Sequence, residues 1–582
     1  MSRLVASAAL WQLAAVLAGS SPAFAQHLEL ASNGDGSVLY VTSYSVLRDT
    51  ATPMHAQRRL YRIGPDGVQL FAERGPAPAA PGLTFFSSSD GIAVPQPSDD
   101  GETVAYTIHG VCVADPCVIG SVAELKGTTT LQLGVGTVQM SRNGRWAVIS
   151  SDPNIRVQDR TAELIDLNSG QRSSVPQPVV VPFAVASDGS ILVLQGGLGL
   201  WRDGQVTTLP LGERPIRPLA LSDNARVFVY SEVSVVLPKP GGIQLKARDI
   251  GSGRDTVLFQ PNGFQLPQFL GMSDDGRLVL YSVIGPASNG PAFLADTSTG
   301  QATQVMLPDG EQPVAGTLSG DGSSAFIATT SGRILKFRIQ GLGSTSETLI
   351  APTPDAGHTG LFPRGSLKRL KGYLPGSVDD LRGRILLDGR SIPVLFVDSN
   401  GVAIQVPWEQ HFGDVPFLLD VPSDSPFIHY ELVPVEALAP VFEPLDTGQT
   451  AVLPIKLVKG DFSGLVDTPP QPGDIVIAYM TGLGPVKGQP QTAIPTPIGA
   501  LMPLDGSFTC TFSQQASPSD RAQAQSTAET LFVGLAPSLI GIYQVTFRMP
   551  ADAGQGRIVG VTCQLTTPLG EGSLGLFLLG GS

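Results

Sequence analysis

The stretch SDDGRLVLYS, residues 273–282, decides the fold. Its first half, Ser-Asp-Asp-Gly, is typical of a tight hairpin turn, because Gly accepts a positive φ and Ser or Asp side chains bond back to the turn backbone. Its second half, from Arg277 to Tyr281, alternates in the manner of a strand packed between neighbouring sheets. The stretch therefore predicts a turn that leads into a β-strand.

The same phrase recurs through the first 350 residues, beginning at Ser32, Ser98, Ser141, Ser187, Ser222, Ser273 and Ser319. The turn positions are separated by 65, 43, 45, 36, 51 and 46 residues. A period of forty to fifty residues with four short strands is typical of β-propeller blades. We expect a seven-bladed propeller over residues 26–352, and the alternative is a stack of unrelated hairpins. Its turns are expected on one face, at Gly36, Gly101, Gly144, Gly189, Ala225, Gly276 and Gly322.

A second phrase follows in several repeats, as AELIDLNSGQ from Ala162, LKARDIGSGR from Leu245 and AFLADTSTGQ from Ala292. Each copy predicts a strand, a turn and another strand. Together the two phrases resemble TolB-like and other Ser-Asp-Gly propeller repeats. The Pro-rich stretch 72–97 makes the first interval long, and we interpret it as a loop that projects from one face.

The beginning of the chain and its composition limit the class of protein. The pattern of Arg3, a short apolar run and Ala23-Phe24-Ala25 predicts a secretory signal over residues 1–25. A transmembrane anchor is the alternative, but the apolar run is too short for one. The expected mature protein is therefore secreted, to the periplasm, the cell surface or the medium, with no membrane insertion after cleavage. A net charge of −13 argues against nucleic acid as a partner. With 67 Gly and 49 Pro, the chain is expected to be all-β with many short strands.

Four cysteines in an exported chain predict two disulfides. Cys112 and Cys117 flank a short turn-like sequence, and Cys510 and Cys563 lie in two strand-like segments. A metal site is the alternative to this pairing, but no histidine lies near either cysteine pair.

The C-terminal third carries three recognisable stretches: residues 386–409 (LLDGRSIPVLFVDSNGVAIQVPWE), 471–486 (QPGDIVIAYMTGLGPV) and 531–550 (LFVGLAPSLIGIYQVTFRMP). They resemble the Solibacter-type uncharacterised C-terminal domain of exported acidobacterial proteins. The resemblance implies two immunoglobulin-like β-sandwiches, which we place at residues 361–440 and 441–582 after a linker at 353–360. It implies no reaction. Residues 517–530 predict either a short helix or a polar loop.

No catalytic, cofactor-binding or metal-binding motif is present, so we assign no catalytic residue, cofactor or metal ligand from the sequence. Turn formation accounts for the aspartates of the repeated phrase, and ordinary turns are favoured over calcium sites at residues 33–36 and 98–101. These aspartates are Asp35, Asp99, Asp188, Asp223, Asp274 and Asp321.

Two aromatic residues are weaker candidates for ligand contact. Trp408 could stack on a ligand or pack at the end of a strand. Tyr543 could bind a ligand or lie buried with its hydroxyl hydrogen-bonded.

Two functions of different class fit these features. The first is an exported, non-catalytic binding or cell-surface protein, whose propeller recognises a protein or glycan and whose sandwiches form a stalk or attachment module. The second is an exported hydrolase or lyase that acts on carbohydrate or peptide in the propeller channel. Charged side chains that converge on the propeller axis would favour the enzyme, and small or apolar ones the binding protein.

Overall fold

The computed structural model is all-β, and its described residues contain no helix. No described segment forms a helix long and apolar enough to cross a membrane. The expected signal peptide and the linker at 353–360 lie outside the described residues. The structure describes residues 28–47, 55–74, 91–112, 119–151, 161–175, 182–194, 198–211, 216–233, 242–262, 265–285, 289–339, 361–370, 377–398, 401–421, 427–442, 455–458, 465–466, 472–488, 490–499, 501–515, 525–551 and 558–579.

The N-terminal half consists of successive antiparallel units, each built from strands that are neighbours in sequence. The first unit is β1 (Glu29–Ser32), β2 (Leu39–Leu47), β3 (His55–Gly64) and β4 (Gly67–Arg74). The second is β5 (Gly91–Pro97), β6 (Val104–Cys112), β7 (Ile119–Lys126) and β8 (Thr130–Val135). The third is β9 (Thr137–Met140), β10 (Trp146–Ser150), β11 (Ala162–Asp166) and β12 (Arg172–Ser174).

Three further four-stranded units and one three-stranded unit follow. They are β13 (Pro182–Val185), β14 (Ile191–Leu194), β15 (Leu198–Arg202) and β16 (Gln205–Thr208); β17 (Ile216–Leu221), β18 (Val227–Val233), β19 (Ile243–Asp249) and β20 (Asp255–Phe259); β21 (Leu266–Met272), β22 (Leu278–Ile284), β23 (Asn289–Asp296) and β24 (Ala302–Val305); and β25 (Pro313–Leu318), β26 (Ser324–Thr329) and β27 (Arg333–Arg338).

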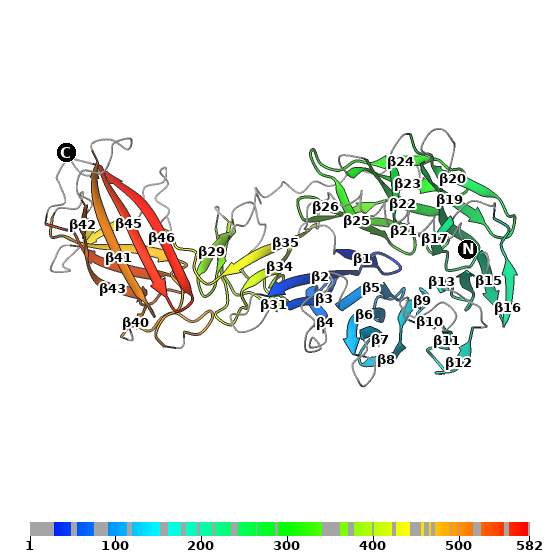
Figure 1. Cartoon of the computed structure of the whole chain (residues 1–582), viewed down its shortest axis with the longest axis horizontal. Helices are drawn as coiled ribbons and strands as arrows, with labels where there is room; N and C mark the ends of the chain where they lie inside the picture. The colour runs from blue at the N-terminus through cyan, green and yellow to red at the C-terminus, as the bar shows by residue number, and fades with distance from the viewer. Residues whose placement is uncertain are drawn as a thin grey trace.

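The units close into a ring. The first strand of each unit lies against the first strand of the next, and β25 of the last unit lies against β1. Apolar side chains from adjacent units share small cores, as between Leu280 of β22 and Ile327 of β26. This half of the chain is a β-propeller, which lies on the right in Figure 1.

The predicted strands of the repeat are confirmed. The second phrase forms β11, β19 and β23, each paired with the strand before it. The interpretation of 72–97 as a loop is wrong at both ends, because residues 72–74 belong to β4 and residues 91–97 form β5, whose prolines lie at a register irregularity and at the strand end.

A second region begins at β28 (Phe362–Pro363) and is joined to the propeller by strand pairing. Its long hairpin consists of β34 (Gly413–Val421) and β35 (Phe427–Glu436). β35 pairs with β27 and supplies a fourth strand to the last propeller unit, while the start of β34 pairs with the end of β2. One sheet therefore runs from the last unit through the hairpin to the first unit.

The hairpin belongs to a two-sheet structure. β30 (Ile385–Leu387), β31 (Arg390–Ser391) and β28 extend its sheet, and a second sheet contains β29 (Leu367–Leu370), β33 (Gly401–Gln405) and β32 (Val394–Asp398). Phe362, Ile404 and Phe417 lie in the core between the two sheets.

The C-terminal residues form two more sheets around a separate core, at the left of Figure 1. The larger sheet contains β36 (Val441–Phe442), β37 (Ile455–Val458), β38 (Leu465–Val466), β39 (Ile475–Thr481), β40 (Met502–Pro503), β43 (Glu529–Leu535) and β44 (Tyr543–Arg548). The smaller contains β41 (Ser507–Gln515), β42 (Gln525–Thr527), β45 (Ile558–Thr567) and β46 (Gly570–Leu579). The helical alternative for 517–530 is wrong over the described part, where β42 and the start of β43 form.

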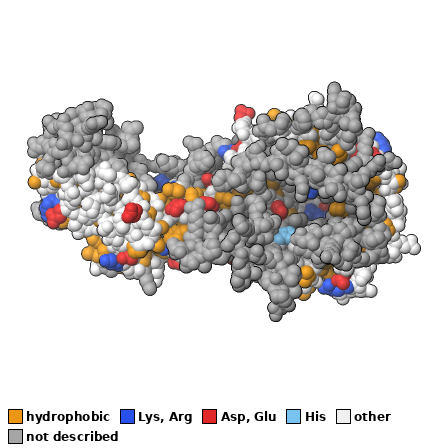
Figure 2. Space-filling view, in the orientation of Figure 1, with side chains coloured by type: hydrophobic (Ala, Val, Ile, Leu, Met, Phe, Trp, Pro, Cys, Tyr) orange, Lys and Arg blue, Asp and Glu red, His pale blue; other side chains and the backbone are white. Residues whose placement is uncertain are grey.

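Cys510 and Cys563 face each other across β41 and β45 and form the expected disulfide. Such a bond favours an oxidising, extracellular environment. The second expected pair lies outside the described residues, because Cys117 and the side chain of Cys112 are not described. Figure 2 shows an elongated outline, with acidic and basic side chains interspersed among the described residues of the visible face.

Candidate functional site

The repeated turns share one hydrogen-bonding pattern. In every copy an Asp or Asn accepts, through Oδ1, a hydrogen bond from the amide two residues further on, and the residue between them has a positive φ. Turn formation is therefore confirmed for Asp35, Asp188 and Asp321. The full set of these capping residues is Asp35, Asp100, Asn143, Asp188, Asn224, Asp275 and Asp321.

The residue before each capping residue, here called the axial residue, joins one turn to another. Gly34 N donates to Asp99 O (2.9 Å), Asp99 N to Arg142 O (2.6 Å) and Ser187 N to Asp223 O (2.8 Å). The chain of bonds continues from Asp223 N to Asp274 O (2.8 Å), from Asp274 N to Gly320 O (2.7 Å) and from Gly320 N to Asn33 O (3.2 Å). The side-chain amide of Asn143 donates to Ser187 O (3.1 Å) and completes the ring. The prediction that the turns lie on one face is confirmed.

Axial side chains converge at the centre of this ring. Arg142 Nε donates to Asp274 Oδ1 (2.8 Å) and lies 3.8 Å from Asp99 Oδ1. Its Nη1 donates to Ser32 O (2.6 Å), so one side chain contacts three other units of the propeller. The turn interpretation is thus wrong for Asp99 and Asp274, because their carboxylates point toward the guanidinium.

Asp223 forms the other side of the cluster. Its Oδ1 accepts a hydrogen bond from the backbone amide of Arg142 (3.2 Å), and its Oδ2 accepts one from Ser187 Oγ. The turn interpretation is wrong here too, since both donors belong to other turns. We call Asp99, Arg142, Asp223 and Asp274 the axial cluster.

The electrostatics of the axial cluster differ from those of the capping residues. Burial raises the pKa of Asp274 to about 7, with Arg142 opposing the shift and Asp99 adding to it. Burial also raises the pKa of Asp223, against the hydrogen bond from Ser187. By contrast, hydrogen bonds from Ser37 and from Ser98 lower the pKa of the capping residues Asp35 and Asp100. Three carboxylates and one guanidinium thus give the axial cluster a surplus of negative charge when ionised.

A shallow depression of about 510 Å³ opens beside the axial cluster. It takes side chains from three successive turns, all of them hydrogen-bonding or acidic: Ser187, Asp188, Asp223, Asn224, Asp274 and Asp275. Within the described ranges, no three His, Cys, Asp or Glu side chains are grouped so that they could hold a metal ion. The depression can accept hydrogen bonds from ligand hydroxyl, amide or ammonium groups.

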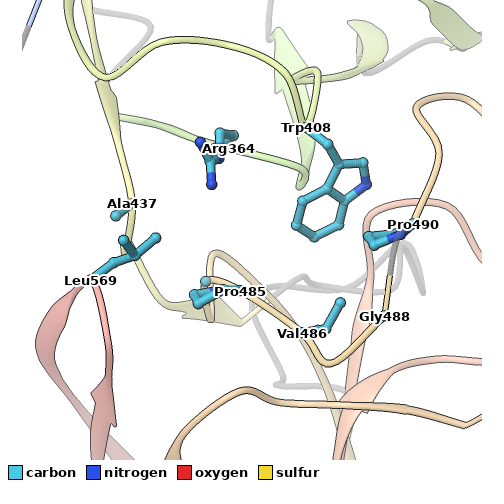
Figure 3. Close-up of a pocket in the computed structure, with 9 residues that line it drawn as sticks. Arg364, Trp408, Ala437, Pro485, Val486, Gly488, Pro490 and Leu569 are labelled. Atoms are coloured by element: carbon cyan, nitrogen blue, oxygen red, sulfur yellow. The ribbon is translucent and has the colours of Figure 1, made fainter. Parts of the chain in front are cut away.

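The two aromatic candidates lie far from the axial cluster, in the C-terminal region. Tyr543 is fully buried in the core of the last two sheets, and its hydroxyl donates to Gly484 O. Trp408 is partly buried and lines a cavity of about 190 Å³ (Figure 3). The cavity lies between the first C-terminal sheet pair, whose sheets contain β34 and β33, and the second, whose sheets contain β39 and β45. The two residues are nevertheless neighbours, because Trp408 packs against the core that contains Tyr543, and Gly484, which accepts the hydrogen bond from Tyr543, also lines the cavity.

Sequence reasoning missed Arg142 and Arg364. Arg142 occupies the position that holds Asp in the copies at Ser98, Ser222 and Ser273, and this departure from the phrase was the available signal. Arg364 joins Trp408 at the cavity, and it carries no local pattern that would mark it.

Comparison with known proteins gives no assignment of function. No family model matches the chain, and no curated protein matches it. Among solved structures, the β-propeller domain of the Trilobed protease from Pyrococcus furiosus is similar at 11% identity and a TM-score of 0.38, covering 57% of this chain and 100% of that one. Oligogalacturonate lyase in complex with manganese gives 9% identity and a TM-score of 0.31, over 52% of this chain and 92% of that one. The oligogalacturonate lyase of Vibrio parahaemolyticus gives 10% identity and a TM-score of 0.30, over 52% of this chain and 92% of that one.

Proposed function

We propose that the protein is an exported, non-catalytic binding protein that recognises a protein or glycan at the mouth of a seven-bladed propeller. The observation that carries this proposal is the convergence of Ser187, Asp223 and Asp274, from different turns, on one open depression. In the proposed architecture, β25 to β27 and β35 together form the seventh blade. The two C-terminal sheet pairs are immunoglobulin-like and act as the stalk or attachment module, in keeping with the resemblance to the Solibacter-type domain.

The charged side chains that converge on the axis meet the condition set above for an enzyme, and we propose recognition instead because of the contacts that Arg142 makes. Its guanidinium is held by Asp274 and by the carbonyl oxygen of Ser32, so it braces the turns against one another. A rigid, solvent-open surface of acceptors suits a ligand rich in hydroxyl or amino groups. The disulfide Cys510–Cys563 supports an extracellular site of action.

The test uses purified residues 26–582 on glycan arrays and in protein pull-downs, followed by calorimetry. Saturable binding that falls at least about tenfold in Asp223→Asn supports the proposal, since a ligand hydrogen bond to a charged group is worth about 1.5–3 kcal/mol. The matched control is Asp66→Asn, which changes an exposed carboxylate on the β3–β4 turn. Ligand binding that is equal in both variants would contradict an axial binding site.

One observation favours an exported hydrolase or lyase instead. Asp274 and Asp99 lie close together at the axis, on either side of Arg142, and a pKa of about 7 for Asp274 suits a general acid or base near neutral pH. The same protein is therefore assayed with glycosidase, lyase, esterase and peptidase substrates. Turnover that disappears in Asp274→Ala would replace the binding function by this one.

A further inference from the structure

The cavity beside Trp408 is a second candidate site, independent of the propeller mouth. Arg364 and Trp408 project into the same space in Figure 3. Both come from the first C-terminal sheet pair, as does Ala437, and the opposite wall belongs to the second. That wall consists of Gly484, Pro485, Val486, Gly488, Pro490 and Leu569.

Arg364 brings a positive charge to this cavity. Its guanidinium is half-buried and lies 4.3 Å from the centre of the Phe412 ring. Burial lowers its pKa, and the Glu409 carboxylate opposes this shift from beyond the distance of an ion pair. A half-buried cation without a carboxylate in direct contact is costly, so an anionic ligand that contacts the guanidinium would be favoured at this position.

Trp408 offers a fixed aromatic surface beside that charge. Its backbone amide donates to Thr492 Oγ1 (3.0 Å). A Cβ atom at Gly365 would lie 2.3 Å from carbons of the indole ring, so the glycine allows one part of the ring to lie directly on the backbone. The ring also borders the cavity, where it can stack on a flat ligand.

The size and walls of the cavity narrow the class of ligand. At about 190 Å³ it is smaller than the ~300–1,000 Å³ pockets that hold drug-sized molecules, so it suits a single ring. Its remaining side chains are apolar, which leaves Arg364 as the charged group. We propose that this cavity binds a small carboxylic acid joined to a six-membered ring, with the carboxylate on Arg364 and the ring on Trp408.

The test measures binding of benzoate and of D-glucuronate to purified residues 26–582, by calorimetry and by tryptophan fluorescence. Benzyl alcohol and D-glucose are the neutral counterparts, and the two pairs distinguish an aromatic acid from a sugar acid. We expect at least one acid to bind saturably and its neutral counterpart to bind at least about tenfold more weakly, because Arg pairs with carboxylates bidentately. Trp408→Phe should remove the fluorescence change.

Two substitutions test whether Arg364 is the residue that binds the carboxylate. Arg364→Gln should weaken binding of the acid at least about tenfold. Arg369→Gln is the matched control, because Arg369 also lies over a phenylalanine, 5.0 Å from the centre of the Phe396 ring, but does not line the cavity. The proposal is overturned if folded wild-type protein binds neither acid, or binds acid and neutral counterpart equally. Unchanged binding in a folded Arg364→Gln variant would overturn it as well, and the wild-type comparison remains decisive if that variant does not fold.

Discussion

Gly320 is the axial residue of the last turn, and its missing side chain leaves room for the axial cluster. A Cβ atom there would lie 1.9 Å from Asp274 Oδ2 and 2.9 Å from Arg142 Nη2. We expect Gly320→Ala to lower the free energy of unfolding by about 1–3 kcal/mol, because the carboxylate must move and the ion pair with Arg142 is disturbed. Urea denaturation measures the change. Gly251→Ala is the control, since its added Cβ meets no atom closer than 3.6 Å, and an equal loss in both variants would contradict this account.

The raised pKa of Asp274 has a consequence for stability against pH. The folded protein holds this proton up to about pH 7, whereas the unfolded chain releases it near 3.8. The folded state therefore binds more protons in that window, and the Asp274 contribution to stability falls as pH rises from about 4 to 7. We expect Asp274→Asn to gain stability relative to wild type over this window, measured by urea denaturation at several pH values.

Asp100 provides a control of opposite sign. The hydrogen bond from Ser98 lowers its pKa, so its contribution to stability is lost as pH falls toward the folded-state pKa. At neutral pH, Asp100→Asn should therefore have a lower free energy of unfolding than wild type. This difference should disappear only in acid. A difference between Asp274→Asn and wild type that stays constant with pH would show that Asp274 titrates normally.

At the scale of elements, the short hairpin of β30 and β31 fixes the first C-terminal sheet to the propeller. Asp388 sits in its turn at a φ of 53°, is 2% exposed, and pairs with the buried Arg59 of β3. Gln410 also donates to Asp388, at 3.2 Å. We expect Asp388→Asn to cost about 3 kcal/mol, because Asn keeps the left-handed turn but leaves Arg59 as a buried charge with a weaker partner.

The control for this pair is Glu73→Gln. Glu73 also contacts Arg59, at 2.9 Å, but its side chain is 39% exposed, so its loss should cost less than about 1 kcal/mol. Calorimetry measures both variants. Equal costs would mean that the buried pair contributes no more than an exposed one.

Elements set by local sequence could be predicted, and those set by distant pairing could not. The turn at Ser273 and the strand after it follow from ten consecutive residues, and they appear as expected. The pairing of Arg333 with His429 joins strands almost a hundred residues apart, and edge-strand hydrogen bonds leave no mark in the side-chain pattern. For the axial cluster, two adjacent aspartates play different parts: Asp275 caps the turn and Asp274 faces the axis. Composition alone could not separate them.

At the scale of the whole molecule, the propeller and the first C-terminal sheet pair depend on each other. β35 covers the edge of the last propeller unit, and Tyr430 and Leu432 complete a core that includes Phe326 and Ile334 of that unit. A chain ending at residue 352 would leave an unpaired strand edge and expose these apolar side chains to water. A chain ending at Phe442 keeps the hairpin and its sheet. We expect the shorter chain to melt about 10 °C or more below the longer one and to bind the hydrophobic dye ANS. Circular dichroism and ANS fluorescence provide the comparison. Equal melting temperatures would show that the propeller closes without its C-terminal strand, in which case the pairing of β35 with β27 serves only to set the position of the C-terminal sheets.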